Sequence, residues 1–175
     1  MRWLTSVPTF LFRAGLVLAF GVVIVAVTVQ VVSRNLLPFS PAWTEELTRF
    51  ALLYLAAFGI GLAYRTGDLV NIDVLLEALP ERVGWMLRLA AAVLTCGMAL
   101  LLIEPAMRFT EIGRMQTSPV LGIRMNWSHG AMIVLLVGLA IFAALRVVEM
   151  LTGSSDGRPA PPADDPGTPQ PGGTK

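Results

Sequence analysis

The sequence predicts an all-α integral membrane protein with four transmembrane helices. Hydrophobic residues make up 55% of the 175 residues and charged residues only 14%, whereas soluble domains carry about 25% charged residues. Mean hydropathy is +0.69. Long uncharged apolar segments recur four times, and each is long enough to form most of a membrane span. No remaining segment is long enough to form a soluble domain with its own core.

The first predicted helix covers about residues 14–33. The twenty residues between Arg13 and Arg34 carry no charge, and at about 1.5 Å per residue they match a hydrocarbon core of about 30 Å. A cleaved signal peptide is the competing interpretation. A transmembrane helix is favoured because the run exceeds a typical signal-peptide apolar region and no A-x-A-like cleavage site follows before Arg34.

The second predicted helix covers about residues 44–64. Only the fifteen residues 50–64 are free of charge, which is about 22 Å of helix and too short for the hydrocarbon core. The helix must therefore extend backwards through Arg49 and Glu46. Ser40 and Pro41 form a helix-start signal, an N-cap followed by proline at the first helical position.

The third and fourth predicted helices cover about residues 85–104 and 126–146. Fifteen uncharged residues separate Arg88 from Glu104, so the third helix needs the preceding turn, with Trp85 at the interface, to span. The chain remains helical in character beyond Glu104, with a kink expected at Pro105. The fourth segment holds twenty-one uncharged residues and is long enough alone.

The segment between the second and third spans predicts a short amphipathic helix at about residues 69–80. As a helix, it places leucines and Ile72 on one side and Asp73, Glu77 and Glu81 on the other, which suits an interfacial position. Alternation of Val70, Ile72 and Val74 also fits a strand. Helix is favoured because an isolated strand beside a bilayer leaves its backbone groups unpaired.

A polar tail follows the membrane domain, which we assign to residues 1–152. Glycine and proline make up eleven of the twenty-three residues 153–175, and none is a large apolar residue. Such a composition cannot bury a core, so the tail is expected to be disordered.

The distribution of basic residues predicts the orientation. Eight lie on the side of the two termini and five on the opposite side, so the positive-inside rule places both termini in the cytoplasm. The eight are Arg2, Arg13, Arg65, Arg82, Arg88, Arg146, Arg158 and Lys175, and the five are Arg34, Arg49, Arg108, Arg114 and Arg124.

Several function classes lack the residues they need. A formal net charge of +1 leaves no basic surface for nucleic acid. A single histidine, His129, and a single cysteine, Cys96, provide neither a zinc cluster nor paired haem ligands. Central parts of the spans hold no ionisable transport residue. We therefore predict no catalytic, cofactor-binding or metal-binding residue and no enzyme activity.

The stretch WTEELTRF at the start of the second helix is the strongest candidate for a special role. Glu45 and Arg49 are i, i+4 neighbours and Glu46 and Arg49 are i, i+3 neighbours, so a local ion pair is the simplest explanation. Contact with another subunit is the alternative, and a partly desolvated charge would matter far more there.

The order of these landmarks resembles the small permease subunit of tripartite ATP-independent periplasmic (TRAP) transporters, the DctQ-type family. The resemblance covers roughly residues 10–150. Its pattern runs from W-x-E-E-x-x-R through a glycine, R-x-G with a downstream aspartate and L-P to S-P-x-L-G-I before the last span. The matching positions are Trp43, Glu45, Glu46 and Arg49; Gly59; Arg65, Gly67 and Asp73; Leu79 and Pro80; and Ser118 to Ile123.

This resemblance implies a complex of three parts in the bacterial inner membrane and periplasm. A periplasmic binding protein of the DctP type captures an organic acid, and a large permease of the DctM type moves it with sodium. The small subunit enlarges the stationary scaffold among membrane lipids. Candidate subunit-interface residues are then Trp43, Glu45, Glu46, Arg49, Arg65 and Asp73.

Two other membrane classes are weighed against this one. A small multidrug-type exporter needs a glutamate in its first span to couple protons, and residues 14–33 contain none. A membrane anchor of a redox complex would show haem-ligand histidines at helical depth. A generic four-helix membrane protein remains the fallback.

Overall fold

The structure is a computed structural model that describes residues 2–36, 41–66 and 80–153, without the side chains of residues 2–5 and 81. These residues form helices α1 (Arg2–Leu36), α2 (Ala42–Thr66), α4 (Glu81–Ile112) and α5 (Asn126–Leu151), with a short 3-10 helix η1 (Gly113–Met115) after α4. All four α-helices are long and apolar enough to cross a membrane. The predicted all-α fold with four spans is confirmed, and no strand occurs in the part of the chain described.

Each helix extends beyond the span expected from its apolar segment. α1 begins at Arg2 and includes Pro8, and its 35 residues give a length of about 52 Å. α4 continues through Pro105 to Ile112, as the sequence beyond Glu104 predicts. The flanks remain helical although each contains a proline, Pro8 in α1 and Pro105 in α4. The ends of both helices therefore reach past a hydrocarbon core of about 30 Å.

The predicted interfacial helix at 69–80 and most of the predicted tail at 153–175 lie outside the described residues. α2 begins one residue after Pro41, which agrees with the helix-start signal there. The backbone N–H of Thr44 donates to the Pro41 carbonyl at 3.2 Å and closes the first turn.

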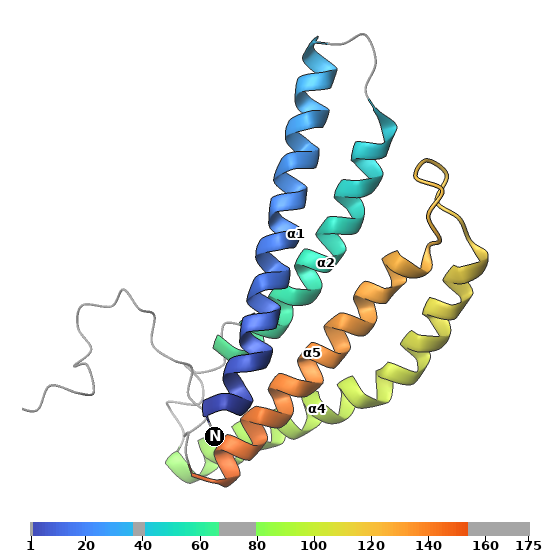
Figure 1. Cartoon of the computed structure of the whole chain (residues 1–175). Helices are drawn as coiled ribbons and strands as arrows, with labels where there is room; N and C mark the ends of the chain where they lie inside the picture. The colour runs from blue at the N-terminus through green and yellow to red at the C-terminus, as the bar shows by residue number, and fades with distance from the viewer. Residues whose placement is uncertain (1, 37–40, 67–79, 154–175) are drawn as a thin grey trace, which may run out of the picture.

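The four helices lie side by side in the order α1, α2, α5, α4 (Figure 1). α1 packs on α2, α2 on α5, and α5 on α4. α5 therefore has a neighbour on two sides and buries the largest share of its residues, whereas α1 and α4 at the two edges bury the smallest. The arrangement is an open row rather than a closed four-helix bundle.

The core lies where α1, α2 and α5 meet. Phe12 of α1 makes perpendicular ring contacts with Phe58 of α2 and Phe142 of α5, at centroid distances of 5.4 and 5.2 Å. Its ring fills the space that glycines leave on both helices. A Cβ at Gly138 would lie 2.4 Å from Phe12 Cε1, and one at Gly61 would lie 3.0 Å from the same atom. Close approach requires glycine at both positions.

Small residues with seven-residue spacing join α4 to α5. Ala92, Ala99 and Ala106 are each 1% exposed and lie one heptad apart on α4. A repeat of 3.5 residues keeps one seam of a helix against its neighbour over several turns. The Cys96 Sγ lies 3.9 Å from the Ala140 carbonyl oxygen of α5, in line with close packing of this pair.

Candidate functional site

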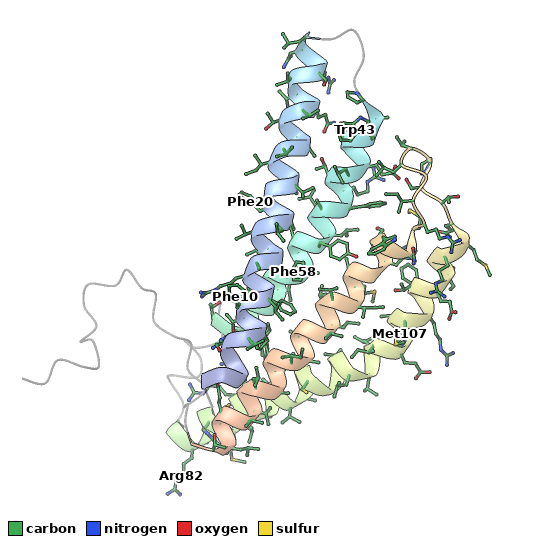
Figure 2. All side chains as sticks on the ribbon, viewed as in Figure 1. Phe10, Phe20, Trp43, Phe58, Arg82 and Met107 are labelled. Atoms are coloured by element: carbon green, nitrogen blue, oxygen red, sulfur yellow. The ribbon has the colours of Figure 1, made fainter. Side chains whose placement is uncertain are left out.

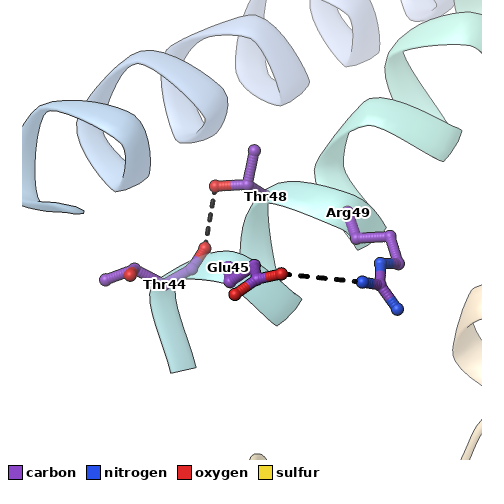
Figure 3. A network of polar contacts seen from close by, with 4 residues as sticks. All are labelled: Thr44, Glu45, Thr48 and Arg49. Atoms are coloured by element: carbon purple, nitrogen blue, oxygen red, sulfur yellow. Dashed lines mark hydrogen bonds and ion pairs between the residues drawn. The ribbon is translucent and has the colours of Figure 1, made fainter. Parts of the chain in front are cut away.

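The first turns of α2, residues 42–49, hold four of the six candidate interface residues, and we call them the α2 entrance. Trp43 is 42% exposed, whereas Thr44 beside it is fully buried. The Thr44 hydroxyl donates to the Pro41 carbonyl at 2.7 Å, and the Thr48 hydroxyl donates to the Thr44 carbonyl at 2.8 Å (Figure 3). Two threonines thus fix the start of the helix, and Trp43 is left at the surface.

Glu45 and Arg49 form the local ion pair that their spacing predicts. Arg49 Nη2 lies 3.8 Å from Glu45 Oε1 (Figure 3), and the two side chains are 72% and 70% exposed. An exposed i, i+4 pair at this distance stabilises a helix by about 0.3–0.5 kcal/mol. Most of both charged groups therefore stays free to meet another molecule.

Glu46, unlike Glu45, has partners in a distant segment, because its carboxylate accepts hydrogen bonds from the loop between α4 and α5. The Leu121 N–H donates to Glu46 Oε2 at 2.9 Å across 75 positions of sequence. The Ser118 side chain and the Val120 N–H also hydrogen-bond this carboxylate. Glu46 therefore links the start of α2 to the connection between the last two helices.

That connection is a short hairpin held by backbone hydrogen bonds, which we call the 118–123 hairpin. Thr117 and Arg124 form an antiparallel bridge, the Ser118 N–H donates to the Ile123 carbonyl at 2.8 Å, and Gly122 has a φ of 64°. A left-handed backbone at this turn favours glycine. The Leu121 N–H is shared between Glu46 and the Ser118 hydroxyl of the hairpin, at 2.9 and 3.2 Å. The charged Glu46 carboxylate is the stronger acceptor of the two, so it helps to hold the hairpin in this shape.

Arg65 lies at the opposite end of α2 from this cluster. Its guanidinium donates to the Thr9 hydroxyl of α1 and so joins the two helices near the N-terminus. The sequence already predicts Arg65 and Arg49 at opposite ends of the second helix, and the structure has them at opposite ends of α2. Asp73, the sixth candidate, lies outside the described residues.

Sequence reasoning missed the long-range partners in this region. Glu46 lies three residues before Arg49, and nothing in that spacing predicts its bond to Leu121. Tyr54 likewise donates its hydroxyl proton to the Trp127 carbonyl at 2.8 Å and joins α2 to α5. The S-P-x-L-G-I motif contains Ser118 and Leu121, so this motif is the sequence feature that points to the hairpin.

The described residues contain no cluster of His, Cys, Asp or Glu suited to a metal ion. Some polar side chains inside the spans bond within their own helix, and the Thr95 hydroxyl donates to the Ala91 carbonyl at 2.8 Å. Thr95 also hydrogen-bonds the Tyr64 side chain of α2. The arrangement at the α2 entrance offers hydrogen bonds, exposed charges and an exposed tryptophan. These groups suit contact between proteins more than chemistry on a small molecule.

Comparison with known proteins gives a family and two relatives. Residues 23–153 match the family described as "Tripartite ATP-independent periplasmic transporters, DctQ component". A putative TRAP transporter small permease protein of Haemophilus influenzae is 22% identical over 80% of this chain and 85% of that protein. The sialic acid TRAP transporter permease protein SiaT of Haemophilus influenzae is 23% identical over 89% of this chain. The chain spans only 25% of SiaT.

Proposed function

Since the chain belongs to the family of DctQ components of tripartite ATP-independent periplasmic transporters, we propose that it is a scaffold subunit for a large permease. It is a multi-pass membrane protein with four membrane-length helices. In the proposed role it supports sodium-coupled uptake of an organic acid delivered by a periplasmic binding protein. The uncharged centres of its spans carry this proposal, because a carrier of an acid and a cation needs polar groups within the membrane.

The length of SiaT supports a separate permease partner. The match covers 25% of SiaT, so most of that protein has no counterpart in this chain. A large permease subunit on another chain would supply the missing part, together with the sites for substrate and sodium. The name of SiaT makes sialic acid the first substrate to test, and other carboxylic acids follow.

The proposed orientation has both termini in the cytoplasm of a bacterial inner membrane. Eight basic residues against five support it. The α2 entrance and the 118–123 hairpin then lie on the periplasmic side, where a binding protein arrives. Trp43, Glu45 and Arg49 are the proposed contact residues there, because all three are exposed. Reporter fusions after residues 38 and 70 should report periplasm and cytoplasm respectively, and the reverse result would refute the orientation.

Uptake assays test the function directly. Cells that make the large permease and the binding protein of the same transporter are compared with and without this chain, with labelled sialic acid and other carboxylic acids in sodium or choline buffer. We expect uptake that depends on both the chain and sodium. Uptake that is unchanged when the chain is deleted would refute the scaffold role.

A further inference from the structure

α4 presents an exposed face with the same heptad spacing as its buried one. The face comprises the half-buried Gly97 and five exposed residues, and the separations along it alternate between three and four residues: Leu87, Ala90, Leu94, Gly97, Leu101 and Glu104. We call it the outer α4 seam. Ala90 lies two residues from Ala92 of the buried alanine seam, which is about 200° around the helix. The two seams therefore lie on opposite sides of α4.

The outer α4 seam has no neighbouring helix among the residues that the structure describes. Leu94 and Leu101 are 67% and 78% exposed, and a Cβ placed on Gly97 would meet nothing within 4 Å. α5 contacts the opposite side, and α4 stands at the edge of the row (Figure 1). A heptad seam with small residues is a shape that a second helix packs against closely.

An ion pair lies at the C-terminal end of the outer α4 seam, where the uncharged part of the helix ends. Arg108 Nη2 is 2.7 Å from Glu104 Oε1, and both side chains are at least 75% exposed. The exposed side chains near the pair include the apolar Met107 (Figure 2) and Ile112, which are 58% and 57% exposed, and the charged Glu111. Acyl chains cannot hydrogen-bond the remaining lone pairs and N–H groups of such a pair, whereas a polar side chain of a neighbouring helix can.

The two edges of the row differ in how they fit a bilayer. α1 has twenty uncharged residues between Arg13 and Arg34, or about 30 Å of helix, which matches a hydrocarbon core. α4 has fifteen between Arg88 and Glu104, or about 22 Å, which is too short. Lipid therefore suits the exposed face of α1, where Phe20 projects (Figure 2), better than it suits the outer α4 seam.

We propose that the outer α4 seam is where a transmembrane helix of the large permease subunit docks, with α1 left facing lipid. This rests on the proposed function and specifies which edge of the row meets the partner. The docking helix carries a small or branched apolar residue opposite Gly97 and a polar residue opposite the Glu104–Arg108 pair. The permease is chosen as occupant because SiaT contains a counterpart of this chain within a much longer permease protein.

Photo-crosslinking from two matched leucines tests the proposal. A photoreactive amino acid replaces Leu101 on the seam or Leu18 on α1, which are 78% and 71% exposed, in the full chain coexpressed with the large permease of its transporter. We expect an adduct with the permease from position 101 and little from position 18. Adducts mainly from position 18, or an adduct of position 101 with a second copy of this chain, would overturn the proposal.

A second pair of variants tests whether added side-chain volume on the outer α4 seam weakens binding to the permease. Gly97→Leu fills the seam and Gly21→Leu fills α1, and in each case the added Cβ meets nothing within 4 Å in this chain. We expect Gly97→Leu to lower co-purification with the permease about tenfold, which equals about 1.4 kcal/mol, and Gly21→Leu to leave it unchanged. Equal effects would overturn the seam assignment. Absence of co-purification with the unaltered chain would instead refute the proposed function.

Discussion

Phe12→Ala should loosen the junction of three helices. Phe12 makes two perpendicular ring pairs, with Phe58 and with Phe142, and each such pair contributes about 0.5–1.5 kcal/mol beyond burial. Transfer from water contributes little inside a micelle or bilayer. Losing both pairs should therefore lower the free energy of unfolding by about 1–3 kcal/mol.

Phe20→Ala is the matched control on the same helix. Phe20 is 53% exposed and faces away from the row (Figure 2). Reversible unfolding in mixed micelles, followed by circular dichroism as the sodium dodecyl sulfate fraction rises, measures both variants. Equal destabilisation by the two substitutions would refute the reasoning, because it would assign the effect to loss of any phenyl ring from α1.

Gly138→Ala completes the test through a double-mutant cycle. Its Cβ would lie 2.4 Å from Phe12 Cε1, and such crowding costs about 1–3 kcal/mol when the neighbour cannot move freely. In the Phe12→Ala background the methyl group has room, so the substitution should be close to neutral. Strictly additive effects would show that the two residues do not share the contact.

Three further predictions concern the other contacts. Glu46→Gln should accelerate hydrogen exchange of the Leu121 amide several-fold because a charged acceptor is lost. The control Glu45→Gln should leave that exchange rate unchanged. Equal exchange rates in the two variants would show that Glu46 does not hold the hairpin. Arg49→Ala should change the free energy of unfolding by no more than about 0.5 kcal/mol, because its pair is exposed, and a larger loss in micelle unfolding would contradict that. Gly113→Ala, whose Cβ would lie 2.5 Å from His129 Nδ1 and 2.9 Å from the Asn126 backbone nitrogen, should destabilise by about 1–3 kcal/mol. The control Gly97→Ala should be tolerated, and the reverse order of stabilities would contradict the packing at the α4–α5 corner.

The number and approximate position of the helices could be predicted because each follows from local sequence. Fifteen uncharged residues are too few to span, so the backward extension of α2 through Arg49 follows from length alone. The Glu45–Arg49 pair follows from helical spacing. These inferences use residues within one or two turns of each other, where geometry is fixed by the helix itself.

The order of helices in the row and the role of Glu46 could not be predicted in this way. Glu46 looks like half of another local pair, but its carboxylate binds a hairpin 75 positions later. Local spacing does not specify contacts between segments so far apart. The alanine heptad at Ala92, Ala99 and Ala106 is visible in the sequence, yet an apolar helix offers several such stripes. Only the packing on α5 distinguishes the buried stripe from the outer one.

The open row of helices affects how fast copies of this protein without a partner are degraded in the cell. α4 buries few of its residues against the described part of the chain, so in the proposed complex much of its packing comes from the permease helix. A chain without that neighbour would open locally more often, and proteases act on opened states. We expect unassembled copies to be degraded faster than assembled ones, so that turnover matches the amount of this chain to that of its partner.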